Sequence, residues 1–241
     1  LKLCEETFAQ LRLGTSRINK RYARPQVRAS ILPYMAGEAV IPNLQSFKQQ
    51  YPDVELFIET SYQYVDFGRD DVDCAIRYGD GNWPGTCAEK LLPVLGIPIC
   101  SPEYQQKHQL HHPQDIVGKE VIQLPMAPEA WQVWCKAAGV NGFNLEHSLS
   151  LDSLLANMQA AERGVGIAIG VIPLIYPWLT SGRVVCPFDT AIEVDEGYYF
   201  VYREDDKDRP EIHQFKTWVQ DLFNHHFIRP KDFQVNITHL K

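Results

Sequence analysis

The sequence predicts an α/β fold, because short apolar runs typical of buried strands alternate with helical segments of about 10–15 residues. The chain has 241 residues, of which 45% are hydrophobic and 22% charged, and these proportions are ordinary for a globular protein with a substantial core. An eight-unit barrel would fit poorly into this length. Two small open sheets, each covered by helices, would fit well.

Residues 25–60 are predicted to form the first β-α-β unit. Residues 27–32 have the pattern of a buried strand that Pro33 ends, and residues 54–59 form the next strand. The helix between them is expected to begin near Val40, since Pro42 fits only in the first turn of a helix. One apolar face of this helix would pack on the two strands.

The same alternation continues along the rest of the chain. A helix from Ser153 to Arg163 is the strongest, with Asp152 or Ser153 as its N-cap and Gly164 just beyond its last turn. A short helix is expected to start at Ser101-Pro102, and further helices are expected at residues 131–138 and 210–223. Strands are expected at residues 73–78, 91–95, 97–100, 121–124, 148–151, 165–169, 183–186 and 198–202.

Charge and motifs argue against several classes of function. The formal net charge is −7, which disfavours a chain that neutralises nucleic-acid phosphates, although residues 12–28 carry a basic run with no acid. Gly164, Gly166 and Gly170 imitate a dinucleotide fingerprint but follow a helix and open a strand, the reverse of the required order. No catalytic constellation, cofactor motif or metal motif is recognised, and no apolar run is long enough to span a membrane.

Two clusters could be taken for metal ligands. His108, His111 and His112 form one, for which a solvated surface loop is the better interpretation. Asp70, Asp71 and Asp73 form the other, but the glycine and terminal glutamate of a calcium loop are missing, so solvation and capping are expected. Neither cluster predicts a metal site.

A long ordered set of segments resembles a known family. These are residues 41–47, 51–56, 65–85, 100–104, 160–168, 182–188 and 197–199, with the run Asp73-Cys74-Ala75-Ile76-Arg77-Tyr78-Gly79-Asp80-Gly81 the most specific. Together they are similar to the effector-binding domain of LysR-type transcriptional regulators, in the subgroup of the glycine-cleavage activator and the β-lactamase regulator. The resemblance covers about residues 25–223.

The resemblance implies a type 2 periplasmic-binding-protein-like fold, in which each of two lobes is a small mixed sheet flanked by helices. Lobe one would be residues 25–98 plus 199–223 and lobe two residues 99–198, with a hinge near residues 97–100 and 198–200. Residues 1–24 would be the end of a linker helix, and residues 224–241 a C-terminal tail beyond the resemblance.

The implied function is effector sensing by a regulator in the cytoplasm. A small molecule would bind in the cleft between the lobes, and the chain would form a homodimer or tetramer through residues 40–50. DNA would be contacted only through an N-terminal winged helix-turn-helix that is absent from this sequence, and neither a membrane nor a cofactor is expected. The alternative is a stand-alone solute-binding protein of a transporter, which has the same fold.

The implied ligand-binding residues come from both lobes. Relatives place Ser or Thr after the first strand, whereas Tyr34 and Met35 stand there in this chain, which favours a larger or more apolar ligand. The full set is Pro33, Tyr34, Met35, Tyr78, Gly79, Asp80, Cys100, Ser101, Ser150, Asp152, Ser153 and Tyr199.

Simpler roles are open for several of these residues. Capping a helix could be the whole role of Ser153 and Asp152. Packing could be the whole role of Tyr78 and of Trp83. Arg77 is expected to pair with an acid rather than with a ligand. A redox role for Cys100 would need a resolving cysteine, which the sequence does not indicate.

Overall fold

The computed structural model describes residues 25–146 and 148–238, so the predicted linker helix at 1–24 lies outside the described residues. The chain divides into two compact units. Of the described residues, the first unit contains 25–91 and 197–225, and the second contains 92–146, 148–196 and 226–238. The division therefore lies a few residues before the predicted 98/99 and 198/199 boundaries, and the tail groups with the second unit.

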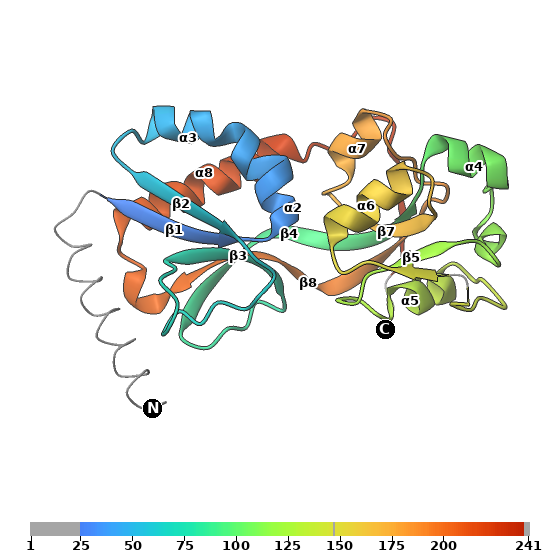
Figure 1. Cartoon of the computed structure of the whole chain (residues 1–241), viewed down its shortest axis with the longest axis horizontal. Coiled ribbons are helices and arrows are strands. Elements are labelled where there is room, and N and C mark those ends of the chain that lie inside the picture. Colours follow the sequence, from blue (N-terminus) through green and yellow to red (C-terminus); the bar gives the residue numbers. More distant parts are fainter. Residues whose placement is uncertain (1–24, 147, 239–241) are drawn as a thin grey trace. The chain divides into compact units, whose positions relative to one another are not determined.

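The sheet of the first unit is built around β1 (Gln26–Ile31), which lies between β2 (Glu55–Thr60) and β3 (Cys74–Gly79) (Figure 1). Both neighbours are parallel to β1. β8 (Thr190–Arg203) returns antiparallel to β3, and β4 (Thr86–Ile99) follows beyond β8. The sheet is thus mixed: β2, β1 and β3 are parallel, and β8 is antiparallel to β3.

The helical segment after β1 begins earlier than the sequence predicts. It runs through α2 (Pro33–Met35), a π-helical turn (Ala36–Val40), a 3-10 turn (Ile41–Asn43) and α3 (Leu44–Gln50). Pro33 thus starts the helix rather than merely ending the strand, and Pro42 lies inside the segment. Because proline lacks an amide hydrogen and its ring crowds the carbonyl four residues back, the regular α-helical bonding is replaced there by the π and 3-10 turns.

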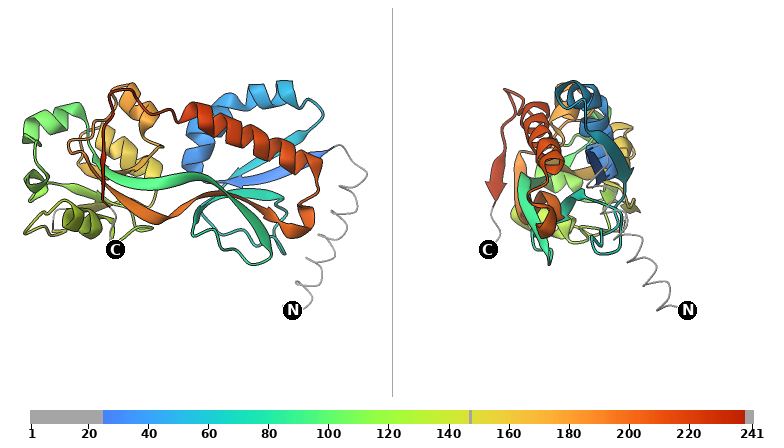
Figure 2. Two further views of the ribbon diagram at one scale, coloured as in Figure 1. Left: turned by 180° about the vertical axis from the view of Figure 1, so that it is seen from behind. Right: turned by 90° about the vertical axis from the view of Figure 1, so that its left-hand side faces the viewer.

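Aromatic residues hold α3 and α8 (Pro210–His226) on the same side of the first unit's sheet (Figure 2). The ring centroid of Phe47 lies 5.6 Å from that of Phe215 and 5.3 Å from that of Trp218. Phe215 in turn lies 6.0 Å from Phe200 of β8. These apolar contacts form the core of the unit.

Asp73, which directly precedes β3, is fully buried and links β1 to α8 through its side chain. Its carboxylate accepts the backbone N–H of Arg28 and a guanidinium N–H of Arg209, each at 2.8 Å. The sequence-based expectation that this aspartate is solvated is therefore wrong. The charge is kept in the interior by an ion pair and hydrogen bonds, as buried carboxylates require. A 3-10 turn at Glu204–Asp206 leads from β8 toward α8.

The sheet of the second unit contains the far part of β4, β5 (Val121–Gln123), β6 (Ser148–Ser150) and β7 (Ile167–Ile172). β5 lies between β6 and β7 and is parallel to both, while β4 is antiparallel to β7. β9 (Asn236–Thr238) adds to β8 in parallel at residues 190–192. The helical elements are α4 (Pro102–His108), a 3-10 turn (Pro113–Ile116), α5 (Ala130–Ala137), α6 (Leu154–Glu162) and α7 (Tyr176–Thr180).

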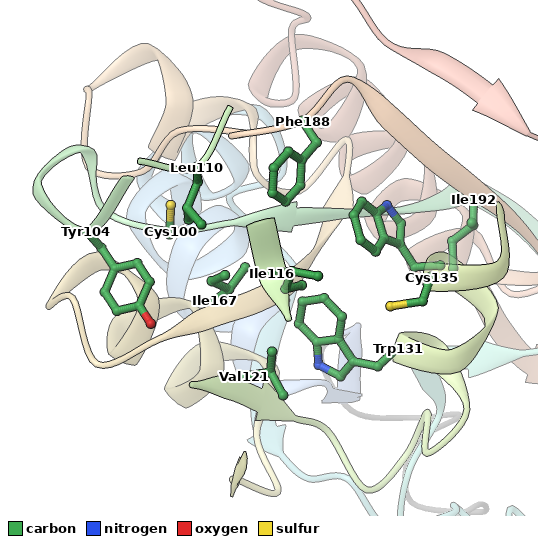
Figure 3. Packing of buried hydrophobic residues seen from close by; sticks show 11 residues of the cluster. Cys100, Tyr104, Leu110, Ile116, Val121, Trp131, Cys135, Ile167, Phe188 and Ile192 are labelled. Atoms are coloured by element: carbon green, nitrogen blue, oxygen red, sulfur yellow. The ribbon is translucent and has the colours of Figure 1, made fainter. Parts of the chain in front are cut away.

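The core of the second unit is rich in aromatic rings (Figure 3). Trp134 and Phe188 stack with centroids 5.4 Å apart, and Trp131 meets Trp134 edge-on at 6.1 Å. Each indole N–H reaches a backbone carbonyl, that of Ile122 for Trp131 and that of Thr190 for Trp134. The polar atoms of these large side chains are thereby satisfied in the interior.

Two further predicted features differ from the structure, and one helix is additional. Residues 91–95 and 97–99 are parts of one long strand, β4, which ends just before Cys100 and in which Gly96 leaves space for Ile169 and Ile192. Residues 183–186 form only an isolated bridge, Val185 to Cys100, instead of a strand. Helix α7 was not predicted, because it is only five residues long and contains Pro177.

Candidate functional site

In the first unit, several predicted site residues meet at one edge of the sheet. Because β1 and β3 are parallel, Pro33 and Tyr34, which follow β1, lie at the same edge as Tyr78 and Gly79, which end β3. β8 begins its pairing with β3 at this edge, where Gly197 faces Gly79. The carboxyl edge of an α/β sheet is where such folds usually bind ligands.

The residues after β1 differ in how much surface they present. Tyr34 is 2% exposed and Met35 is fully buried, so both side chains belong to the core. Pro33 is partly exposed and occupies the first position of α2. The substitution Tyr34→Ala, which a surface site would tolerate, would instead leave a cavity in the core.

Two tyrosines and a turn follow at the end of β3. Tyr78 faces Tyr198 across the strand pair, with ring centroids 5.4 Å apart, and burial raises the pKa of Tyr198 well above its usual value. Asp80 is exposed, and its carboxylate accepts the N–H of Asn82 at 2.9 Å. Asp80 therefore stabilises the turn and still presents a negative charge to solvent.

Tyr199 and Trp83 form a small aromatic surface beside that turn. Their ring centroids lie 5.6 Å apart, and both side chains are partly exposed. Gly79 and Gly81 make room for the rings, since a Cβ at Gly79 would lie 2.9 Å from the Trp83 ring and one at Gly81 2.8 Å from the Tyr199 ring. Gly81 also has a φ of +87°, which other residues rarely adopt.

Arg77 lies on the same face of the sheet as Tyr199, its partner across the β3–β8 pair, and has no acid partner among the described residues. Its guanidinium donates to the Ser30 and Ile76 carbonyls at 3.0 and 2.9 Å and to the Ser30 hydroxyl at 2.7 Å. Among residues 25–146 and 148–238, no carboxylate lies within 4.0 Å of it, so the expected ion pair is wrong. Burial lowers the pKa of Arg77 to about 10, and the negative charge of Glu59 partly opposes that effect.

In the second unit, the N-terminus of α6 carries the second group of predicted residues. Ser153 is the N-cap, and its hydroxyl accepts the N–H of Ala156 at 3.4 Å. Asn157 is 2% exposed, and its side-chain amide donates to the carbonyls of Leu151 and Ser153, each at 2.9 Å. The capping role predicted for Ser153 is therefore present, and Asn157 fixes the turn before the helix.

Ser150 and Asp152 are exposed around this turn. Ser150 is the last residue of β6 and pairs with Gln123, the last residue of β5, so both lie at the carboxyl edge of the second sheet. Gln123 is partly exposed and donates to the Ser148 hydroxyl at 2.8 Å. Gln123 could not be singled out from the sequence, because a glutamine that ends a short strand is not distinctive.

Cys100 and Ser101 are not brought to this edge. Ile99 pairs with Ala168 near the start of β7, and the Ser101 hydroxyl lies 3.4 Å from the Cβ position of Gly164, beyond the C-terminal end of α6. Both residues therefore lie at the amino edge, at the opposite end of α6 from Ser153. The physical reason is that β4 enters the second unit near Leu92, so its last residues are already at the far edge.

Both residues also have structural roles where they lie. Ser101 is 2% exposed and caps α4 by accepting the N–H of Tyr104 at 3.1 Å. Cys100 is fully buried and pairs with Val185. Burial raises the pKa of the Cys100 thiol to about 12, which leaves very little thiolate at neutral pH and disfavours a redox role.

Glycines that imitate a dinucleotide motif have other roles. Gly164 ends α6 with a φ of +70°, and a Cβ at Gly166 would lie 2.7 Å from the Glu120 carbonyl oxygen. At Gly170 a Cβ would lie 2.8 Å from Ile175. Within the part of the chain that is described, no three His, Cys, Asp or Glu side chains are grouped as metal ligands, and no helix is both long and apolar enough to cross a bilayer.

Comparison with known sequences finds a family that matches most of the chain. The profile of the LysR substrate binding domain matches residues 20–224. The glycine cleavage system transcriptional activator of Escherichia coli K12 is 30% identical over 216 residues, which is 89% of this chain and 70% of that protein. The HTH-type transcriptional activator AmpR of Enterobacter cloacae is 29% identical over 220 residues, covering 91% of this chain and 74% of AmpR.

Solved structures agree with the sequence comparison. The effector domain of AmpR from Pseudomonas aeruginosa superposes with a TM-score of 0.73 at 26% identity, over 83% of this chain and 96% of that one. The AmpR effector binding domain from Citrobacter freundii gives a TM-score of 0.74 at 27% identity, over 83% of this chain and 99% of that one. The profile ends at residue 224, so residues 225–241 lie outside the matched region.

Proposed function

This chain belongs to the family of LysR substrate-binding domains and is the effector-sensing domain of a transcriptional regulator, and from that premise we propose how it binds its effector. The effector is a small molecule, and in each unit the carboxyl edge of the sheet supplies residues that bind it. The residues that present surface there are Pro33, Tyr78, Gly79, Asp80, Tyr199, Ser150, Asp152 and Ser153.

One observation carries this proposal. Each unit separately places exposed or partly exposed polar or aromatic side chains at the carboxyl edge of its own parallel strands: Tyr78 near the end of β3 with Asp80 just beyond it, and Ser150 at the end of β6. In the second unit Ser153 adds the N-terminus of a nine-residue helix, where free backbone N–H groups favour polar or anionic atoms. Open α/β sheets bind ligands at these edges because strand and helix ends leave hydrogen-bonding groups available.

Regulation follows from a change in the population of two lobe arrangements. A ligand that binds one arrangement more tightly shifts the equilibrium toward it by its difference in affinity, and by no more. In a homodimer or tetramer formed through residues 40–50, that shift would pass along the linker helices to winged helix-turn-helix heads on DNA. The relatives are named transcriptional activators, so chemistry on the ligand is not part of the proposal.

A thermal-shift screen of small metabolites against the purified chain tests the proposal. The expected result is that at least one compound raises the unfolding temperature, since a ligand at a hundred times its Kd stabilises the folded state by about 2.7 kcal/mol. Asp152→Ala should weaken that effect, while Asp221→Ala, on an exposed position of α8, serves as the control.

Two further measurements separate the alternatives. Sedimentation at tens of micromolar protein should show a dimer or larger species, and a strict monomer would contradict the proposed assembly. A full-length gene that encodes a helix-turn-helix before Leu1 would support the regulator. A secretory leader there would instead support the solute-binding protein, which the comparisons do not favour.

A further inference from the structure

A pocket of about 760 Å³ on the second unit lies apart from the proposed effector site. It is lined by four segments of that unit, which are residues 111–113, 179, 184–189 and 232–234. This volume lies within the usual range for small-molecule sites. Because Val185 pairs with Cys100 at the amino edge of the sheet, the pocket lies at the edge opposite Ser150 and Ser153.

The C-terminal tail, residues 226–238, supplies one wall of this pocket, and Figure 2 shows it as an extended segment. The backbone N–H and the side-chain amide of Asn236 donate to the carbonyl and the carboxylate of Asp189, at 2.7 and 2.6 Å. The Phe233 ring meets that of Tyr176 edge-on, with centroids 5.6 Å apart. These contacts hold the tail beside residues 184–189. The matched family profile ends at residue 224, so this wall comes from outside the matched region.

A second wall is the loop that carries His111 and His112. The Asp115 carboxylate accepts both of their backbone N–H groups, at 2.9 and 2.7 Å, which fixes the loop. Both histidines are exposed, and an imidazole can donate or accept a hydrogen bond. The apolar lining includes Val184 and Phe188, which are 1% and 5% exposed and belong to the core of the unit. The pocket therefore combines an apolar base with polar walls.

The charged groups that line the pocket are the carboxylates of Asp189 and Asp232, both at exposed positions. Among the described residues, no Lys or Arg lines it. The guanidinium of Arg229 is directed to the Phe233 carbonyl, to which it donates at 3.0 and 2.8 Å. Two carboxylates beside phenyl rings attract a cation, since a carboxylate forms charge-assisted hydrogen bonds and a ring face attracts positive charge. In the described part of the chain no three potential metal ligands are grouped, so the cation that fits is organic.

We propose that this pocket is a second ligand site, which binds a small organic cation with an apolar portion, such as an arylalkyl amine. The ammonium group is held by Asp189 and Asp232, and the apolar portion packs against Phe188 and Phe233. Asn236 engages Oδ2 of Asp189, and the carboxylate has a second oxygen for the ligand. Because Asp232 and Phe233 belong to the tail, a bound cation ties the tail to the rest of the unit. The inference goes beyond the proposed function and does not depend on the effector.

The test is calorimetric titration of the whole chain with benzylamine, phenethylamine and tryptamine, each compared with the alcohol of the same skeleton. We expect an amine to bind about tenfold or more tightly than its alcohol, because the alcohol lacks the charge-assisted hydrogen bonds. Asp232→Asn and Asp189→Asn should each reduce this preference, and the double variant should remove it. Asp195→Asn is the matched control, because it neutralises an exposed aspartate of β8 in the same unit that does not line the pocket.

Several results would overturn the inference. They are equal binding of amines and alcohols, no binding of any of these compounds, a preference that survives in the double variant, and a preference lost as fully in Asp195→Asn. An amine that binds at the effector site would lose affinity in Asp152→Asn rather than in Asp232→Asn, and this result would also overturn it. If Asp189→Asn loosens the tail, Asp232→Asn still decides the question, because its carboxylate is at an exposed position. None of these results bears on the effector site, which the metabolite screen tests separately.

Discussion

Replacing Ser153 by alanine separates the capping of α6 from ligand binding. The Ser153 hydroxyl accepts the Ala156 N–H at 3.4 Å, which is a long hydrogen bond, while the Asn157 amide donates twice at 2.9 Å around the same turn. We therefore place the cost of Ser153→Ala at the lower end of the range for N-caps, about 0.5–1 kcal/mol of unfolding free energy. For a chain of this size that corresponds to a fall in Tm of about 1–4 °C.

Asn157→Ala should cost more than Ser153→Ala. Asn157 is 2% exposed, and its removal leaves the carbonyls of Leu151 and Ser153 without these donors. Loss of such buried partners costs about 1–3 kcal/mol. A larger loss of Tm for Ser153→Ala than for Asn157→Ala, measured by thermal unfolding, would refute the reasoning about which residue holds the turn.

Ser153→Asn completes the series, because asparagine is as good an N-cap as serine. Its Tm should stay close to that of the unsubstituted chain. If Ser153 also contacts the effector, calorimetric titration should show weaker binding in both the alanine and the asparagine variants. If the affinity falls only in the variant whose Tm falls, and Ser153→Asn binds with full affinity, Ser153 serves only as a helix cap.

Three further predictions concern stability and reactivity. Asp73→Asn should lower the free energy of unfolding by about 3–5 kcal/mol in denaturant titrations, because it breaks a buried ion pair, whereas Asp71→Asn, at a half-exposed position, should change it by less than about 1 kcal/mol. The hydrogen bond from Arg183 lowers the pKa of Glu162, so its stabilising contribution is present above the unfolded-state pKa and is lost as pH falls through the folded-state pKa; Glu162→Gln should flatten the acid limb of a Tm-against-pH curve, and an unchanged limb would contradict this. Cys100 should not react with Ellman's reagent at pH 8 until the chain unfolds, so Cys100→Ser should leave the native thiol count unchanged.

Most elements of the fold could be predicted because local patterns agree with tertiary packing. The strand Cys74–Gly79 and the helix Leu154–Glu162 both have apolar periodicity bounded by turn or cap residues. The failures occur where a proline or glycine is accommodated by its neighbours. Pro42 is contained in a helical segment with π and 3-10 turns, and Gly96 continues β4 because Ile169 and Ile192 fill the space beside it.

The candidate site could be predicted only in part, because sequence separation does not tell at which edge of a sheet a residue lies. Tyr78 and Ser150 lie at the carboxyl edges of their sheets as expected, whereas Cys100 lies at the opposite edge since β4 crosses the whole second sheet. The lack of an acid partner for Arg77 also depends on tertiary structure. No pattern of residues along the chain shows whether a carboxylate reaches a buried guanidinium.

Titration of one stabilising compound against variants of both units tests the central claim most directly. The account predicts that Tyr199→Phe in the first unit and Asp152→Ala in the second each raise the Kd of the same compound without a large change in Tm, since both residues are at least partly exposed. Calorimetry on the purified chain gives both values. A compound that binds the chain with a Kd unaffected by either substitution would contradict an effector site built from the carboxyl edges of the two sheets.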